Sequence, residues 1–256
     1  MLLRTFREIT SFYISTLVLQ SEAFMKKFGL IAFIGAVVIG VAAANMIPFG
    51  KVSVKDVVSS LNDSVKGSGN IITESRAADD FSAVEVGGVL RVEITAGKEF
   101  SVNVEADDNL LPYIRTEVDG DTLQISANEK LSSKNPILVR VTAPNIERIN
   151  ASGAASVSII DIKNSDLSVD LSGASELTAA GETNDLNAVL SGSSVIKARR
   201  LSSGSADIDA SGASRAYVLA TKTLTAEASG ASSITYQGNP ENIEKNVSGA
   251  SSIQAD

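Results

Sequence analysis

The strongest constraint on the fold is a short triplet that recurs at nearly even intervals in the second half of the chain. Six copies of Ser-Gly-Ala or Ser-Gly-Ser form a regular series, in which successive glycines are separated by 20, 19, 20, 18 and 19 residues. These glycines are Gly153, Gly173, Gly192, Gly212, Gly230 and Gly249. A period of this length is typical of solenoids, in which each repeat cannot close a core alone and stacks on its neighbour.

Alignment on the glycine shows which positions face inward. The residues two places before and four places after it are apolar in every repeat, whereas the position three before is mostly polar. The position four before is apolar in five repeats and is Lys245 in the last. This period-two alternation indicates a strand on each side of a corner. The sequence therefore predicts an all-β fold, a right-handed parallel β-helix with coils of 19–20 residues.

Glycine suits the corner because it accepts a positive φ without steric cost. The six repeat glycines are therefore predicted to be structural turn residues. The serines that flank them are expected to hydrogen-bond turn amides and to form ladders from coil to coil.

The first half of the chain is predicted to precede this repeat as a separate β region. Residues 79–148 hold short period-two segments divided by turn sequences, and residues 149–256 hold the repeat β-helix. Residues 48–78 are rich in Ser, Asn, Gly and Lys, which is typical of a linker.

Residues 25–47 have the pattern of an export signal. Lys26 and Lys27 precede a long apolar run that ends in Ala42, Ala43 and Ala44. Two interpretations stay open, a signal cleaved after Ala44 or an uncleaved helix that anchors the chain in the inner membrane. Residues 1–24 are either a cytoplasmic lead or the result of a start assigned upstream of Met25. Both interpretations predict an exported protein, in the periplasm or at the cell surface.

The composition excludes several classes of function. The chain has no histidine and no cysteine, so imidazole bases, thiol nucleophiles, disulfides and most zinc sites are ruled out. Its formal charge of −8 opposes a phosphate backbone, so nucleic acid is not an expected partner. No cofactor, resident metal or enzymatic activity is expected.

Two further segments carry a family resemblance. Residues 80–86 read Asp-Phe-Ser-Ala-Val-Glu-Val, and residues 104–111 read Val-Glu-Ala-Asp-Asp-Asn-Leu-Leu. Together with the recurrent Ser-Gly-Ala-Ser, these segments resemble the head GIN domain family, a domain of unknown function in exported bacterial proteins considered to be the heads of autotransporter adhesins. The resemblance implies a β-helical fold and a location in the cell envelope. It brings no catalytic residues.

The candidate site residues lie on the outward rows of the predicted coils. Asp170 and Asp209 occupy equivalent positions two coils apart, about 10 Å by the spacing of β-strands. They are interpreted as solvated surface carboxylates, with a weak calcium site or a glycosidase-like acid and base as the alternatives. Tyr217 is the outward aromatic residue that is a candidate, with Asp170 and Asp209, for contact with a surface ligand; the alternative is a plain surface side chain. Arg199 and Arg200 are interpreted as ordinary surface charges, and Arg215 is expected to pair across coils with Glu176 or one of its neighbours.

The leading functional hypothesis is a non-enzymatic, adhesin-like β-helix that binds an unknown envelope, glycan or protein partner. One alternative is a polysaccharide-active β-helix enzyme that uses outward carboxylates. The other is a structural envelope protein that forms homo-oligomers through the ends of its solenoid, because the last repeat has little to cap it.

Overall fold

The structure, a computed structural model, describes residues 64–256. The predicted lead, the signal or anchor helix and the first part of the predicted linker lie outside these residues. No described element is a helix of the length and apolarity that crossing a lipid bilayer requires. The elements are β1 (Val65–Lys66), β2 (Ile71–Arg76), β3 (Ala83–Val86), β4 (Arg91–Ala96), β5 (Ser101–Asp107), the 3-10 helix η1 (Leu111–Tyr113), β6 (Ile114–Asp119), β7 (Thr122–Ala127), β8 (Leu131–Ser132), β9 (Leu138–Ala143), β10 (Arg148–Ala151), β11 (Ser156–Leu171), β12 (Glu176–Leu190), β13 (Val195–Ala210), β14 (Arg215–Ala228), β15 (Ser233–Gln237), β16 (Asn242–Val247) and β17 (Ser252–Ala255).

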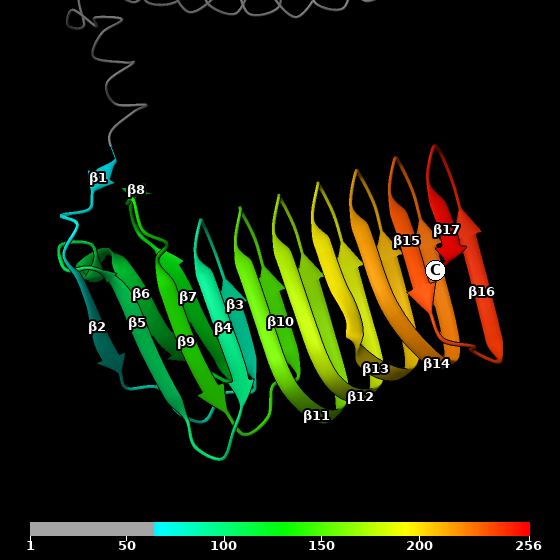
Figure 1. The fold of residues 1–256 in the computed structure, drawn as a ribbon, viewed down its shortest axis with the longest axis horizontal. Helices are drawn as coiled ribbons and strands as arrows, with labels where there is room; N and C mark the ends of the chain where they lie inside the picture. Colours follow the sequence, from blue (N-terminus) through cyan, green and yellow to red (C-terminus); the bar gives the residue numbers. More distant parts are fainter. Residues whose placement is uncertain (1–63) are drawn as a thin grey trace, which may run out of the picture. The chain divides into compact units, whose positions relative to one another are not determined.

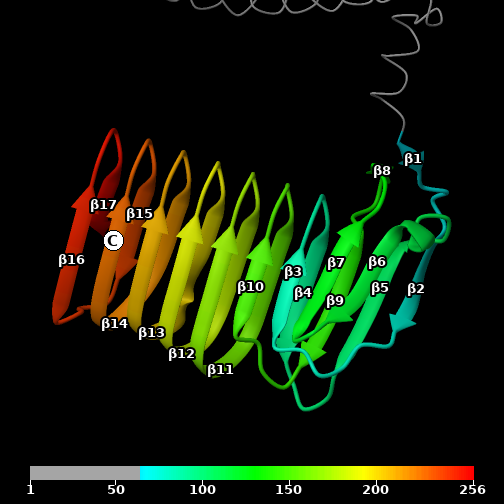
Figure 2. The same ribbon diagram turned by 180° about the vertical axis from the view of Figure 1, so that it is seen from behind.

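The repeat forms a flattened solenoid with two sheet faces (Figures 1 and 2). Each coil runs down one face, bends, runs up the other face and turns into the next coil, so β11, β12, β13 and β14 each cover both faces. The front face, nearest the viewer in Figure 1, consists of β9, β4, the first halves of β11 to β14, β15 and β17. The back face consists of β7, β3, β10, the second halves of β11 to β14, and β16. The predicted all-β solenoid with coils of about 20 residues is confirmed.

The repeat glycines lie above one another in a column at the turns. Their φ angles fall between 71° and 76°. A Cβ on Gly192 would lie 2.6 Å from the carbonyl oxygen of Gly173 in the coil below, and the other repeat glycines meet their lower neighbours in the same way. Each turn therefore requires its glycine for two reasons. The backbone there is left-handed, and the turn of the neighbouring coil approaches too closely to leave room for a side chain. Gly88 begins the column below Gly153, although it is far from the repeat in sequence.

The residue two places after the column glycine is a buried serine in four consecutive coils: Ser175, Ser194, Ser214 and Ser232. The hydroxyl of Ser194 donates to the carbonyl of Ser191 in its own turn at 3.0 Å and to Leu171 in the coil below at 3.3 Å. The expectation of hydrogen bonds from turn amides was wrong in direction, because these hydroxyls donate to carbonyls and the turn amides bond to the coil below.

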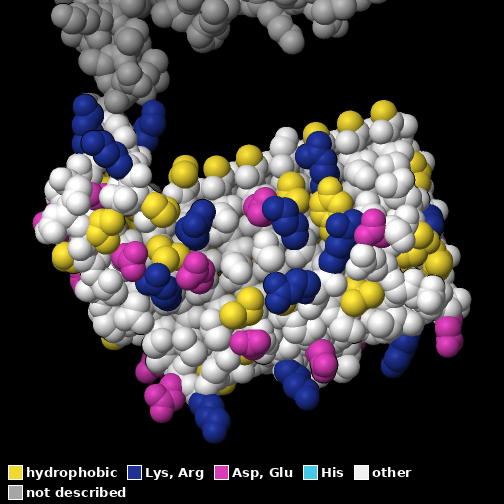
Figure 3. Space-filling view, viewed as in Figure 1, with side chains coloured by type: hydrophobic (Ala, Val, Ile, Leu, Met, Phe, Trp, Pro, Cys, Tyr) yellow, Lys and Arg dark blue, Asp and Glu magenta, His cyan; other side chains and the backbone are white. Residues whose placement is uncertain are grey.

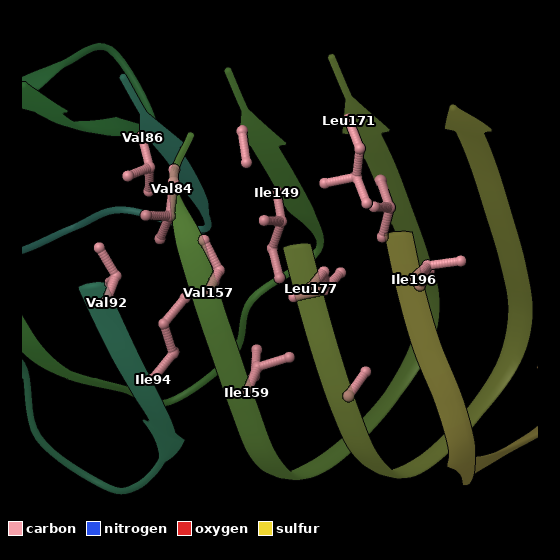
Figure 4. Packing of buried hydrophobic residues seen from close by; sticks show 14 of the residues in the cluster. Val84, Val86, Val92, Ile94, Ile149, Val157, Ile159, Leu171, Leu177 and Ile196 are labelled. Atoms are coloured by element: carbon pink, nitrogen blue, oxygen red, sulfur yellow. The ribbon is translucent and has the colours of Figure 1, made fainter. Parts of the chain in front are cut away.

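The space between the two faces is filled by aliphatic side chains. Figure 4 shows Val84, Ile149, Leu171 and others on the back face pointing toward Val157, Leu177 and Ile196 on the front face. These side chains are almost completely buried. In-register stacking places like residues above like, which explains why the inward rows of the repeat are apolar throughout.

The coil order in space differs from the order in sequence. The coil formed by β3 and β4 pairs on one side with β10 and β11 and on the other side with β7 and β9. The chain therefore leaves the solenoid after β4, builds the coil of β7 and β9 below it, and returns to stack β10 above it. Residues 79–148 and 149–256, predicted as two successive regions, share one continuous sheet and one core.

The N-terminal end of the solenoid is closed by antiparallel strands. On the front face β5 pairs with β9, and β2 pairs with β5; on the back face β6 pairs with β7. Strands β1 and β2 lie within the stretch that the sequence predicts as a linker, so residues 64–78 are part of the folded body. The last strands, β16 and β17, form the opposite end and have no strand beyond them among the described residues.

Candidate functional site

The two faces of the solenoid carry opposite charges. The outward rows of the parallel strands on the back face hold eight exposed carboxylates and one arginine, Arg148; the carboxylates are Glu85, Asp166, Asp170, Asp185, Asp207, Asp209, Glu227 and Glu244. The front face instead gathers basic side chains over its middle coils (Figure 3). Its basic residues are Arg91, Arg140, Lys197, Arg199, Arg200 and Arg215. The net charge of the whole chain conceals this asymmetry.

Three basic residues of β13 and β14, Lys197, Arg199 and Arg215, lie beside Tyr217. Lys197 is the register partner of Tyr217 on the neighbouring strand, and Arg215 lies two residues earlier on the same strand and the same face. The guanidinium carbon of Arg199 lies 4.6 Å from the centroid of the Tyr217 ring. We call Lys197, Arg199, Arg200, Arg215 and Tyr217 the basic cluster.

Two members of the basic cluster already hold carboxylates. Lys197 Nζ lies 2.7 Å from Glu176 Oε1, and Arg199 Nη2 lies 2.9 Å from Asp256 Oδ2. The expected pairing of Arg215 with Glu176 or one of its neighbours was wrong, because Arg215 forms no ion pair among residues 64–256. Val195 separates Arg215 from Glu176 in their row, whereas Lys197 reaches Glu176 diagonally from the adjacent strand.

Tyr217 lies on the outward row where the sequence places it, and its side chain is half-buried. The guanidinium of Arg199 covers its ring. A stacked cation of this kind is held by the ring quadrupole, so the role that the geometry favours for Tyr217 is to position Arg199. Sequence reasoning treated Arg199 and Tyr217 separately because they are 18 residues apart.

The structure places Asp170 and Asp209 on the back face in one row with Val189 between them. Asp209 and Glu227 are closer, as direct register partners. All of these carboxylates are exposed on a flat strand surface, and neither of the two described pockets includes them. No group of three or more carboxylates among residues 64–256 is arranged to hold a metal ion.

An open pocket of about 510 Å³ lies at the top of the solenoid near its N-terminal end. It is formed by the turn at Gly88 and Val89 and by residues 127–137, which connect β7 to β9. Lys130 and Lys134 are the only cations in its lining, and Glu129 is its only carboxylate. This pocket lies on the turn side of coils that precede those of the basic cluster.

A polar clasp at the N-terminal end was missed by sequence reasoning. The carboxylate of Asp108 accepts hydrogen bonds from the Ser68 hydroxyl at 2.5 Å, the Asn70 amide group at 2.9 Å and the Asn109 backbone at 2.7 Å. These bonds, led by the one from Ser68, lower the pKa of Asp108. Buried Asp107 accepts from the backbone of Gly69. The clasp fastens residues 67–70 to the end of β5.

A comparison with protein families matches residues 80–240 to the family described as "Putative auto-transporter adhesin, head GIN domain". The chain belongs to the head GIN domain family. The matched residues run from the start of the Phe-Ser-Ala-Val-Glu-Val segment nearly to β16, and so include the clasp aspartates and the whole basic cluster. The resemblance found in the sequence is thus confirmed.

The fold of this head GIN domain is similar to that of several solved structures. A "putative adhesin" from Bacteroides fragilis is similar with a TM-score of 0.62 at 19% identity, covering 75% of this chain and 100% of that one. A "putative lipid binding protein" from Parabacteroides distasonis is similar with a TM-score of 0.50 at 21% identity, covering 76% of this chain and 100% of that one. At such identities the similarity shows the fold alone. A comparison with curated protein sequences gives no match.

Proposed function

We propose that this chain is a non-enzymatic binding module of the cell envelope that acts as an adhesin. The observation that carries the proposal is the rigid solenoid itself, whose stacked coils present two wide, flat, oppositely charged faces. Membership of a family described as adhesin heads supports the same role. A flat, preorganised β-surface loses little conformational entropy when it binds an extended partner, which suits attachment better than it suits enclosed chemistry.

The proposal includes the location. Residues 25–47 direct export, either as a cleaved signal or as an inner-membrane anchor, and the solenoid acts outside the cytoplasm, in the periplasm or at the cell surface.

The handedness of the solenoid is a further part of the proposal. The coils wind in the right-handed sense, the sense favoured by the twist of parallel strands.

The lack of enzymatic activity is also part of the proposal. Active sites usually lie in concave, largely apolar pockets, whereas Asp170, Asp209 and Glu227 stand exposed on a flat face. If the back face cleaved an acidic polysaccharide, the Asp209→Asn variant would abolish that cleavage. We expect no depolymerisation by either the original protein or the variant.

Deletion of the gene tests the adhesive role. Loss of attachment to a surface or to other cells, restored by re-expression, is the expected result. Digestion of the solenoid by protease added to intact cells would place it at the surface. Unchanged attachment in the deletion strain, together with full protection from protease, would contradict the adhesive role.

A further inference from the structure

The basic cluster combines a guanidinium stacked on a ring with three other exposed cations on the front face. The Arg199 guanidinium stacks on the Tyr217 ring, with 4.6 Å between the guanidinium carbon and the ring centroid. A guanidinium held over a ring keeps its edge free, and that edge offers donors in the planar fork that matches a carboxylate. The contact between Arg199 Nη2 and Asp256 Oδ2 shows a carboxylate bound at this edge.

The cluster contains more positive charges than the carboxylates paired with it neutralise. Its four basic residues form ion pairs with only two carboxylates, Glu176 and Asp256. Among the described residues, Arg200 and Arg215 form no ion pair. Both are exposed, so their donors are available to an incoming anion.

The surroundings of the cluster are hydroxylic and flat. Thr178 is the register partner of Lys197, and Ser233 is the register partner of Arg215, so hydroxyl groups lie on both sides of the cations. The nearest apolar side chains on the same face, Val195 and Leu219, are half-buried. The cluster thus offers charge and hydrogen-bonding groups but no protruding apolar anchor for a bilayer.

We propose that the basic cluster binds an acidic polysaccharide through the carboxylate groups of its sugar residues. Arg215 and Arg200 would contact the carboxylates directly, whereas Lys197 and Arg199 would bind them in place of Glu176 and Asp256. Tyr217 is a positioning residue that holds the Arg199 guanidinium. The inference rests on the proposed binding function and adds a ligand class and a face to it. The acidic back face would repel the same polymer, so binding occurs on one side of the solenoid.

Titration of the full chain, kept in mild detergent, with alginate oligosaccharides tests this inference. We expect binding that weakens steeply as salt is added, and no binding to neutral maltooligosaccharides of the same length. Absence of alginate binding at low salt would overturn the inference. Binding to phosphatidylglycerol vesicles without binding to alginate would also overturn it, because the surface would then recognise a membrane.

A matched pair of variants localises the site. Arg215→Ala removes an unpaired arginine from the cluster, and Arg91→Ala removes an arginine from the same row of the front face, four strands away. We expect Arg215→Ala to weaken alginate binding about tenfold, the loss of one charge-assisted contact, and Arg91→Ala to leave it nearly unchanged. Equal losses in the two variants would indicate a general effect of charge and would overturn the inference.

A second pair tests the positioning role of Tyr217. Tyr217→Phe keeps the ring beneath the guanidinium and should bind alginate like the original protein. Tyr217→Ala frees Arg199 and should weaken binding several-fold, with the thermal unfolding of both variants measured alongside. Equal binding by the two variants would refute the role of the ring.

The same variants separate this inference from the adhesive function. A strain that carries Arg215→Ala should attach less well than one that carries Arg91→Ala. If gene deletion abolishes attachment while Arg215→Ala leaves it intact, the adhesive function stands and the proposed ligand site is wrong.

Discussion

The two ends of the solenoid are finished in different ways. At the N-terminal end, β2, β5 and β6 cover the last parallel coil, and Val102, Val104 and Leu110 are fully buried there. At the C-terminal end, every residue of β16 is exposed, and the side chains of Ile243 and Val247 have exposed fractions of 46% and 48%. The same inward rows that build the core in the middle coils thus meet solvent at this end.

The difference shows how an open β-edge is kept from uncontrolled pairing. Lys245 stands at an inward position of β16, where every other repeat has an apolar residue. Its ammonium lies 4.5 Å from the Tyr236 ring centroid and donates to the Tyr236 hydroxyl at 2.9 Å. A charge pointing inward on an edge strand is a known protection against edge-to-edge association, because another strand would have to bury it. Self-association through this end, one of the alternatives raised by the sequence, is therefore disfavoured.

The largest expected effect distinguishes the middle of the glycine column from its start. Gly192→Ala introduces both a strained positive φ and a Cβ 2.6 Å from a carbonyl oxygen, whereas a Cβ on Gly88, at φ 92°, meets nothing within 4 Å. We expect Gly192→Ala to lower the free energy of unfolding by about 4 kcal/mol and Gly88→Ala by about 1–2 kcal/mol. Urea denaturation measures both. Similar losses would mean that the stacked turns relax and that contact within the column is unimportant.

A second pair compares the core of a middle coil with that of the open end. Leu186 and Ile243 occupy the same inward row, but Leu186 is buried and Ile243 is half exposed. Leu186→Ala should cost about 3 kcal/mol because it leaves a cavity, and Ile243→Ala should cost less than about 1 kcal/mol. Chemical denaturation of both variants checks this prediction. An equal cost would show that the open end is covered in solution.

A third substitution removes the charge that protects the open end. Lys245→Val completes the apolar row, and two copies related by a two-fold axis could then pair their β16 edges with both inward rows on one side. We expect the molar mass from light scattering to double, while the free energy of unfolding at low concentration changes by no more than about 0.5 kcal/mol. Lys222→Val, at an exposed position of the neighbouring strand β14 and not on β16 itself, is the control and should keep the original mass. If both variants keep it, Lys245 does not protect this end.

The smallest effect concerns the clasp at the closed end. Because its hydrogen bonds lower the pKa of Asp108 in the folded state, their stabilising contribution is complete at neutral pH and is lost as the pH falls through that lowered pKa. Backbone amides of residues 68–70 should then exchange with solvent faster, while the repeat coils stay protected. Hydrogen exchange measured across the acidic range checks this. In Asp108→Asn, exchange at residues 68–70 should already be fast at neutral pH, and persistence of the pH-dependent step would assign it to another group.

The repeat was predictable because its constraints are local. A positive φ at Gly173 or Gly212 and an apolar residue two places before it belong to one short segment, so the period and inward rows can be found without coordinates. The place of Gly88 in the column was not predictable in this way. It lies 65 residues before Gly153, and only the insertion of β5 to β9 explains the gap.

The candidate site was predictable only in part for the same reason. The outward rows placed Tyr217, Asp170 and Asp209 on their faces, since alternation decides which side a residue takes. The stack of Arg199 on Tyr217 depends on the register between coils and on the register shift in β13. The pairing of Glu176 with Lys197 likewise depends on a diagonal across strands that residue types do not reveal.

The interleaved coil has a consequence for how the chain acquires its structure as it is made. Strand β3 lies between β7 and β10, so it has both of its neighbours only after residue 151 has emerged. A fragment ending near residue 148 would contain the closed end and an unfinished coil with a bare edge. We therefore expect no stable folding intermediate composed of the first half alone. The first strands of the repeat must be synthesised before the earlier strands can form their complete hydrogen-bonded pairing.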